Sequence, residues 1–179
     1  KIGISNNFTM EAWVYPTANA FDFVNDYMTI IWFGGQGGAQ LSALALIYNT
    51  TQSVNKLGYL SSDFSSNLTV PLNQWSHVAV TYKGGTYGEG LSLYVNGIPN
   101  QTKLIEISGS LGSTPTITDS TLHIGERQDA NSARFKGSID EVRVWNRVLS
   151  LEEVNASYQA GTYRLTRNFT GLSDGNYSY

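Results

Sequence analysis

Two pairs of adjacent carboxylates are candidates for acid–base chemistry in this chain. Asp140 and Glu141 are neighbours in a stretch of alternating apolar residues, and Glu152 and Glu153 are neighbours in a predicted helix. Glycoside hydrolysis by two carboxylates requires both acids to flank one bond. Adjacent residues of a strand point to opposite faces of the sheet, and the helical pair is expected on the surface, so we expect neither pair to be catalytic.

Both histidines, His77 and His123, lie in predicted strands. Ser-His-Asp chemistry requires a histidine that meets a positioned serine. We expect each imidazole to be satisfied by its neighbours instead of acting as a base or a metal ligand. The chain has no cysteine, so disulfides, thiolate metal sites and cysteine nucleophiles are excluded together.

The charge balance argues against polyanionic partners. Charged residues make up 14% of the 179 residues, and the formal net charge is -3. Because phosphate neutralisation needs clustered Lys and Arg, we expect no nucleic acid partner and no docking on anionic lipid. No apolar run reaches the roughly 18 to 20 residues that span a bilayer, which predicts no direct membrane insertion. If the protein is exported, Lys1 lies downstream of the signal.

The polar composition of the chain predicts an extracellular location. The chain contains 18 Gly and 11 Tyr and is rich in Ser, Thr and Asn, as extracellular β domains commonly are. Asn-x-Ser/Thr triplets, the acceptor pattern for N-glycosylation, predict a glycosylated surface, although a Ser/Thr/Asn-rich chain also produces them by chance. They occur at Asn7, Asn49, Asn67, Asn100, Asn155, Asn168 and Asn176. Asn155 lies in the predicted helix and can carry a glycan only if it faces solvent.

Short strands separated by turns predict one all-β domain. Phe8, Met10, Ala12 and Val14 alternate with Thr9, Glu11, Trp13 and Tyr15, which is the pattern of a strand with two different faces. Further strands are expected at 27–33, 40–48, 56–60, 68–70, 75–83, 91–96, 98–107, 121–125 and 135–145. Asn96-Gly97 predicts a type I′ hairpin turn. This spacing is typical of a two-sheet antiparallel sandwich.

A short surface helix follows the last strand. Ser150 and Glu153 form a capping box, and the helix is expected to end before Gly161. We therefore place one domain at 1–161. Residues 162–179 alternate again from Tyr163, which predicts a tail, a linker or the first strand of a following module.

Four segments in order, FTMEAWVYP, WSHVAVTYKGG, LSLYVNG and GSIDEVRVWNRVLSLEEV, resemble the laminin-G-like domains of the concanavalin A-like lectin/glucanase superfamily. The resemblance covers about residues 8 to 161 and implies an antiparallel jelly roll in a larger extracellular protein. Such domains bind carbohydrate, bind protein, cleave glycans or act as spacers. The family usually has another strand before the segment that matches FTMEAWV, where this chain has only Lys1 to Asn7. Either this chain is a fragment, or the tail or a neighbouring subunit is expected to fill that place by strand addition.

The resemblance also implies a structural Ca²⁺, with Asp140 as one ligand. The alternative is that Asp140 bonds to nearby backbone or pairs with Arg143 or Arg147. Candidate ligand-binding residues on the predicted loops are Asp22, Asn25, Asp26, Tyr48, Arg127, Asp129 and Asn131. Core packing is expected for Trp13, Trp32, Trp75 and Trp145.

Three functions follow from this reading. The first is a non-catalytic extracellular module for adhesion or carbohydrate recognition, with a glycan or a cell-surface protein as partner. The second is a glycosylated subunit of a surface layer or filament, assembled with itself through its terminal strands. The third is a diverged glycoside hydrolase. The laminarinase-like members of the superfamily carry Glu-x-Asp-x-Glu on a strand, and this sequence lacks that triplet, so we expect no enzyme activity.

Overall fold

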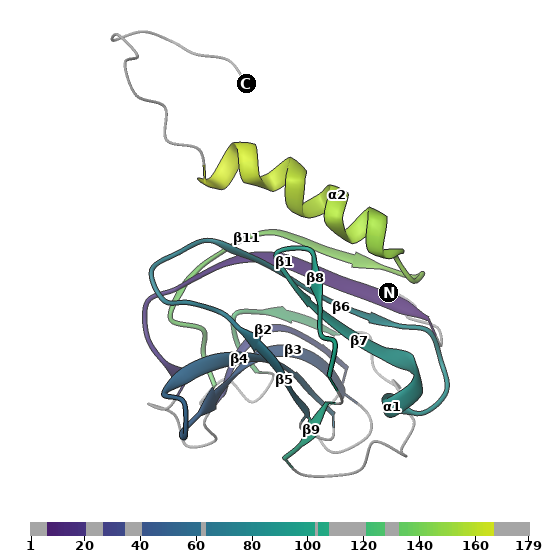
Figure 1. Ribbon diagram of the computed structural model, residues 1–179, viewed down its shortest axis with the longest axis horizontal. Coiled ribbons are helices and arrows are strands. Elements are labelled where there is room, and N and C mark those ends of the chain that lie inside the picture. Colours follow the sequence, from purple (N-terminus) through teal and green to yellow (C-terminus); the bar gives the residue numbers. More distant parts are fainter. Residues whose placement is uncertain are drawn as a thin grey trace, which may run out of the picture.

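A computed structural model describes residues 7–20, 27–34, 41–61, 64–102, 104–107, 121–127 and 133–166. They form two antiparallel sheets packed face to face, with a helix on the outer side of one sheet (Figure 1). The five-stranded sheet has the order β11-β1-β6-β7-β8, and the six-stranded sheet has the order β10-β2-β3-β4-β5-β9. This architecture confirms the predicted all-β jelly roll with a C-terminal helix.

The strands of the five-stranded sheet are β1 (Phe8–Pro16), β6 (Ser76–Tyr82), β7 (Leu91–Val95), β8 (Ile98–Pro99) and β11 (Gly137–Trp145). Those of the six-stranded sheet are β2 (Tyr27–Gly34), β3 (Leu41–Asn49), β4 (Val54–Leu60), β5 (Phe64–Thr69), β9 (Ile105–Glu106) and β10 (Leu122–Ile124). The helices are α1 (Tyr87–Gly90) and α2 (Leu151–Gly161), and α2 continues into a π-helical turn (Thr162–Thr166). No helix in this described part of the chain is long and apolar enough to cross a membrane.

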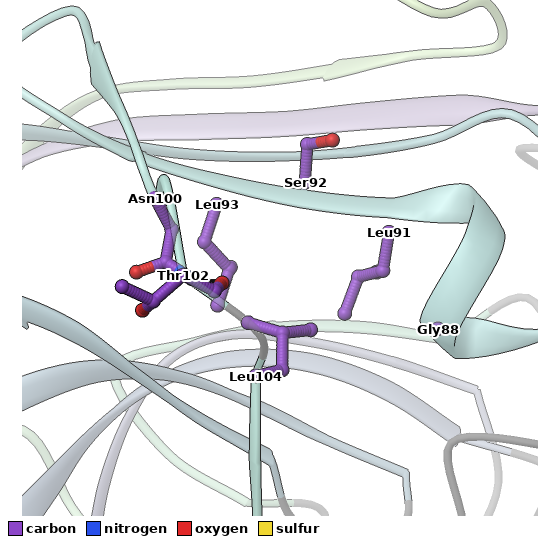
Figure 2. A pocket seen from close by; sticks show the side chains of 7 residues that line it. All are labelled: Gly88, Leu91, Ser92, Leu93, Asn100, Thr102 and Leu104. Atoms are coloured by element: carbon purple, nitrogen blue, oxygen red, sulfur yellow. Dashed lines mark hydrogen bonds between the residues drawn. The ribbon is translucent and has the colours of Figure 1, made fainter.

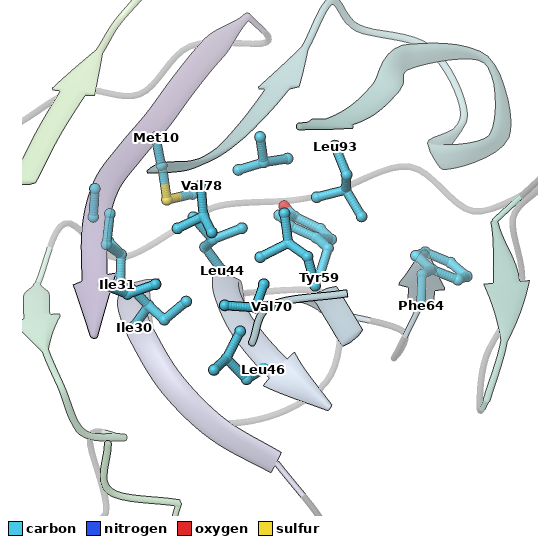
Figure 3. Close-up of a cluster of buried hydrophobic side chains, with 14 of the residues drawn as sticks. Met10, Ile30, Ile31, Leu44, Leu46, Tyr59, Phe64, Val70, Val78 and Leu93 are labelled. Carbon is cyan, nitrogen blue, oxygen red and sulfur yellow. The ribbon is translucent and has the colours of Figure 1, made fainter. Parts of the chain in front are cut away.

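The core lies between the inner faces of the two sheets (Figure 3). Met10 and Val78 reach it from the five-stranded sheet, and Leu44 and Tyr59 reach it from the six-stranded sheet, each with 0% of its surface exposed. Their alternation along each strand follows from the two-residue period of extended backbone. Removal of these apolar side chains from water is the main stabilisation of the sandwich.

The outer face of β1 is also buried. Thr9, Glu11 and Trp13, which alternate with the core residues, have exposed fractions of 0%, 0% and 1%. They lie beneath α2, where Trp13 stacks on Tyr158 with ring centroids 5.8 Å apart. The helix therefore forms a third layer on the five-stranded sheet, and Figure 1 shows it lying across β11 and β1.

A short helix that the sequence did not predict fills the connection between β6 and β7. Its Tyr87 side chain is fully buried, with its ring 5.2 Å from that of Phe64 and 5.8 Å from that of Tyr59. Burial raises the pKa of Tyr59 well above its usual value and also raises the pKa of Tyr87. These phenols therefore stay protonated at neutral pH.

The return strand predicted at Ile98–Ile107 is wrong as one strand. Pro99 closes β8 after two residues, because proline has no backbone N–H for the ladder. The chain then leaves the five-stranded sheet and joins the six-stranded sheet as β9, which pairs with β5. We call the described residues 100–102 and 104 the crossing segment.

The capping box of α2 is confirmed. The Ser150 hydroxyl accepts from the Glu153 amide, and the Glu153 carboxylate accepts from the Ser150 amide at 2.9 Å. The helix nevertheless includes Gly161, and the π-helical turn occupies the first tail residues, where alternation had indicated extended chain. The hairpin turn is also confirmed, since Asn96 and Gly97 have φ values of 52° and 75°.

Candidate functional site

Tyr27 and Arg127 meet at one end of the six-stranded sheet. The Arg127 guanidinium donates a hydrogen bond to the Tyr27 hydroxyl across 100 residues of sequence. Its central carbon also lies 5.4 Å from the ring centroid of Trp32, which is within the range of a cation–π contact. Two contacts thus fix the position of this cation, and both come from β2.

The flanks of two predicted loops converge at the same place. Asn55 accepts from the Ala20 amide at 2.9 Å and donates to the Ala18 carbonyl at 3.4 Å, which ties the chain just before residue 21 to β4. The Thr29 amide donates to the Ala133 carbonyl at 2.8 Å, which ties the chain just after residue 132 to β2. The segments 21–26 and 128–132 therefore both begin and end at this end of the sheet.

We call this region the loop end and define it by Tyr27, Tyr48, Asn55, Arg127 and Ala133. Of the seven predicted ligand-binding residues, the structure describes Tyr48 and Arg127. The others lie outside the described residues, in the two segments whose flanks meet here: Asp22, Asn25, Asp26, Asp129 and Asn131. Their role in binding stays a prediction.

Tyr48 and Arg127 lie on different faces of the sheet. Tyr48 is partly buried against the main core, whereas Tyr27 packs on the outer cluster of Trp32, Ala43, Ala45, Ile47 and Leu60. Tyr48 therefore shapes the inner side of the loop end. Tyr27 and Arg127 form its outer side.

Among the described residues, the buried polar atoms of this outer face without a hydrogen-bond partner include one atom of β2 and one of β10. They are Oγ1 of Thr29, a residue with 0% exposure, and Nε2 of His123. His123 stands directly opposite Trp32 in the ladder between β10 and β2. An unpaired buried polar atom costs about 1–3 kcal/mol, and each such atom in a native structure calls for an explanation. The expectation that His123 is satisfied by neighbours is wrong for this nitrogen.

Sequence reasoning missed Tyr27, Thr29 and Trp32 as members of one outer-face cluster. The stretch YMTIIWF was interpreted as a fully buried strand. A bulge between Thr29 and Ile31 turns both Ile30 and Ile31 into the core, so the alternation changes phase within the strand. Only the polar Thr29 within the apolar run could have indicated an outer face.

A second polar cluster is buried beneath α2. The Glu11 carboxylate accepts from the Trp145 indole and the Ser157 hydroxyl, each at 3.2 Å, and lies 3.4 Å from the Arg143 guanidinium. His77 Nε2 lies 3.4 Å from the second carboxylate oxygen, but neither ring nitrogen of His77 has a hydrogen-bond partner. Glu11 is therefore the neighbour that pairs with the His77 ring.

Burial disfavours the charged form of Glu11 and would raise its pKa. His77, Trp145 and Arg143 outweigh burial, so the pKa of Glu11 lies below its usual value. Glu11 is thus an ionised carboxylate with 0% exposure under a helix. This buried carboxylate links β1 to α2 through the Ser157 hydroxyl.

The acids of β11 do not follow the predicted alternation. Glu141 has a φ of 51° at a bulge opposite β1, and its carboxylate binds both Arg143 and Arg164. Asp140 stands opposite Trp13 and accepts a hydrogen bond from the Glu141 amide at 2.7 Å. The expectation that the pair faces opposite sides is wrong because the bulge interrupts the two-residue period.

Asp140 bonds to nearby backbone, as one of the two alternatives predicted, and does not pair with Arg143 or Arg147. Arg143 pairs with Glu11 and Glu141, and Arg147 pairs with Glu153 at 2.8 Å. Calcium takes six to eight oxygen ligands. Among the described residues, no three His, Cys, Asp or Glu side chains gather where a metal could bind. These residues do not assemble a calcium site at Asp140, and the ion stays a prediction.

Most predicted glycosylation sites are on the surface. Asn7, Asn67 and Asn155 are exposed, and Asn49 and Asn100 are partly exposed. The helical Asn155 therefore meets the condition set for it. Asn168 and Asn176 lie outside the described residues.

The fold defines a class of protein, a two-sheet antiparallel sandwich with a helix on the outer side of one sheet. The sequence model of the Concanavalin A-like lectin/glucanases superfamily matches residues 1–155, and the chain belongs to that superfamily. The laminin-G-like resemblance is thereby confirmed.

Two relatives match by sequence. The human Adhesion G-protein coupled receptor D1 is 25% identical over 145 residues, which cover 81% of this chain and 14% of the receptor. The C-reactive protein of Sus scrofa is 34% identical over 77 residues, covering 40% of this chain and 32% of that protein. The chain thus matches less than a third of the length of either relative.

Solved structures share the fold. A heptameric SAP-like pentraxin from Limulus polyphemus has a TM-score of 0.62 at 17% identity, over 86% of this chain and 70% of its own. A putative carbohydrate binding protein from Bacteroides ovatus has a TM-score of 0.58 at 21% identity, over 84% and 40%. A Trypanosoma rangeli sialidase has a TM-score of 0.59 at 19% identity, over 90% and 24%.

Proposed function

We propose that this chain is a non-catalytic recognition module of a cell-surface or secreted protein, which binds glycans through the loop end. The observation that carries the proposal is the Arg127 guanidinium, held by the Tyr27 hydroxyl and the Trp32 ring beside the described residues that flank segments 21–26 and 128–132. Binding residues are often found on loops that a rigid scaffold positions. A planar cation beside aromatic rings can donate hydrogen bonds to sugar hydroxyl and carboxylate oxygens.

Relatives and neighbours support the recognition role. The relatives are named as an adhesion receptor and a C-reactive protein, and one structural neighbour is titled a putative carbohydrate binding protein. The sialidase neighbour shares only the fold, over 24% of its own chain. Within the described residues, the carboxylates of Glu11, Glu141 and Glu153 are all engaged by arginines, which argues for a non-catalytic module.

A glycan array with matched arginine variants tests the proposal. Arg147 is the natural control, because it also lies over a tryptophan, Trp145, on the outer face of the other sheet, with 5.5 Å to the ring centroid. We expect the wild-type protein to bind a subset of glycans and Arg127→Ala to weaken binding by roughly ten- to a hundredfold, the size of a lost hydrogen bond to a charged group. Arg147→Ala should bind as the wild type does.

Tyr27→Phe keeps the ring and removes the hydroxyl that holds Arg127, so an intermediate loss is expected. The proposal fails if no glycan binds, or if Arg127→Ala binds as tightly as the wild type. Calcium is tested separately, by thermal unfolding in excess Ca²⁺ and in chelator. An ion that binds only the native state raises the melting temperature.

A further inference from the structure

The crossing segment covers a cavity at the lateral edge of the sandwich. The cavity has a volume of about 180 Å³ and lies between β7, α1 and the crossing segment (Figure 2). Leu91 and Leu104 form its apolar wall above the buried Leu93, and Asn100 and Thr102 form its polar wall, whereas the Ser92 side chain points away from them in Figure 2. A volume of this size corresponds to a few water molecules or one small ring.

Asn100 is both a wall of this cavity and the acceptor position of an Asn-x-Thr triplet. Figure 2 shows Asn100 and Thr102 together beside Leu93 and Leu104. The Asn100 Nδ2 donates to the Thr102 carbonyl at 2.6 Å, and its Oδ1 accepts from the Asn67 amide at 3.1 Å. A carboxamide nitrogen has two hydrogens, so one remains for substitution.

We propose that Asn100 carries an N-linked glycan whose first sugar occupies this cavity and fastens the crossing segment to β7. The apolar face of the sugar ring packs on Leu91 and Leu104, and its hydroxyl groups face solvent. The inference rests on the extracellular placement proposed above and is independent of what the loop end binds.

The modification requires no redox step. Asn100 Nδ2 loses one proton and forms a bond to C1 of the sugar, while the bond from C1 to the diphosphate of a lipid-linked donor breaks. The diphosphate leaves with the electron pair of that bond. The second N–H is retained and can still donate to the Thr102 carbonyl, so the folded crossing segment is compatible with the sugar.

None of the other described acceptor positions, Asn7, Asn49, Asn67 and Asn155, is among the residues that line this cavity. Asn155 Oδ1 lies against the turn at Gly97, and Asn49 Oδ1 caps the Gln52 amide at 2.8 Å. Asn67 lies closest to Asn100, and its Nδ2 donates to the Thr102 hydroxyl at 2.8 Å. None of the three lines the cavity at the crossing segment. Glycans there are expected to project into solvent.

The cavity also lies beside apolar surface that a glycan would shield. Ile98 of β8 and Ile105 of β9 have exposed fractions of 59% and 45%. Both belong to two-residue strands at the edges of their sheets. Exposed edge strands with apolar side chains are sites of unwanted pairing, which a glycan at the crossing segment would prevent.

The test is secretion from a host whose N-glycans begin with N-acetylglucosamine, followed by mass spectrometry of the Asn100 peptide. One portion is trimmed by an endoglycosidase to a single sugar at each site, and a second batch is made without glycosylation in a bacterial host. We expect Asn100 to be occupied. The trimmed form should keep the melting temperature of the full glycoprotein, about 2–4 °C above the unglycosylated form.

Thr102→Val and Thr102→Ser separate the sugar from the hydrogen bond. Thr102→Ser keeps the triplet and the hydroxyl, whereas Thr102→Val loses both. In the bacterial host, the difference between the two variants reports the change of side chain (hydroxyl and methyl groups) without any sugar. In the glycosylating host it should be larger by the same 2–4 °C.

Asn155→Gln is the control, because removal of a solvent-projecting glycan should leave the melting temperature unchanged. An unoccupied Asn100 overturns the inference. Occupancy without any difference between the single-sugar and unglycosylated forms overturns the seating in the cavity. A protein that carries the sugar but binds no glycan contradicts the proposed function and leaves this inference intact.

Discussion

A buried, ionised glutamate is the unusual residue of this sandwich. Glu11 is positioned by the alternation of β1 and receives its partners from three other elements: His77 of β6, Arg143 of β11 and Ser157 of α2. A buried charge is tolerated only when it is paired and hydrogen-bonded, and removal of one partner is costly. The carboxylate therefore joins two neighbouring strands and the helix.

Glu11→Gln should lower the free energy of unfolding by about 1–3 kcal/mol, because the amide cannot accept equally from Arg143, Trp145 and Ser157. It should also remove part of the acid dependence. The folded pKa of Glu11 lies below the ordinary value of 4.5. Its stabilisation is therefore complete above that pH and is lost as the pH falls through the lower, folded pKa. Urea unfolding from pH 7 to pH 3 measures both effects.

Glu126→Gln is the matched control for this prediction. Glu126 is 42% exposed and lies 3.8 Å from Arg134, so its replacement should leave the acid limb of the stability curve in place. An unchanged acid limb in Glu11→Gln would contradict the prediction, since some other group would then control stability in that range.

Among the elements, α2 packs tightly on the five-stranded sheet and contributes to the stability of the sandwich. Val154 is fully buried against Ala79, Tyr94 and Leu149, and Gly161 lies against the Trp13 indole. The helix packs on the sheet through Val154 and Tyr158, which are four residues apart and therefore lie on one face of the helix. What it binds to, the outer face of β1 and β6, depends on the tertiary arrangement.

Gly161→Ala tests this docking. A Cβ on residue 161 would lie 2.0 Å from the Trp13 Nε1, far inside van der Waals contact. Overpacking of this kind typically costs about 1–3 kcal/mol, although alanine is the better helix former. We expect a lower unfolding midpoint and a changed near-ultraviolet circular dichroism of Trp13. Gln159→Ala, an exposed position of the same helix, should keep or raise stability.

Sequence patterns predicted the strands and helices better than the contacts that these elements make with one another. The capping box at Ser150 and the Asn96-Gly97 turn were predictable because local hydrogen bonds and backbone preferences decide both. The burial of Glu11, the meeting of Tyr27 with Arg127 and the crossing at Asn100 were not predictable. Each depends on contacts between segments that are far apart in sequence, such as the 100 residues between Tyr27 and Arg127.

The bulges show a second limit of pattern reading. The period of two residues holds along β1 but shifts at Thr29 in β2 and at Glu141 in β11. Both shifts change which side chains share a face, and neither changes the composition of the strand. The family resemblance correctly gave the sandwich, but it could not locate these changes of phase.

At the scale of the whole molecule, the protein has three layers: the six-stranded sheet, the five-stranded sheet and α2 (Figure 1). The two lateral edges differ. Strands β8 and β9 are only two residues long, whereas β11 has nine residues at the other edge. The bulge at Glu141 and the charges of Arg143 and Arg164 interrupt that long edge, and bulges and charges both discourage strand addition.

The three-layer arrangement predicts where the chain can be shortened. A protein that ends after Thr166 retains α2 and its contacts, so we expect cooperative unfolding at the melting temperature of the full chain. A protein that ends after Ser150 loses the cover over Glu11, Trp13 and His77. An uncovered Trp13 and an unsupported buried pair should abolish the cooperative transition or lower its midpoint by more than 10 °C, roughly the effect of several kcal/mol.

Differential scanning calorimetry of the two shortened proteins checks this prediction, with secretion yield as a second readout. Equal melting of both would show that α2 is dispensable and that the five-stranded sheet tolerates an open outer face. Unfolding of the protein that ends after Thr166 would instead show that residues 167–179 belong to the same cooperative unit. The predicted domain boundary would then have to move toward the C-terminus.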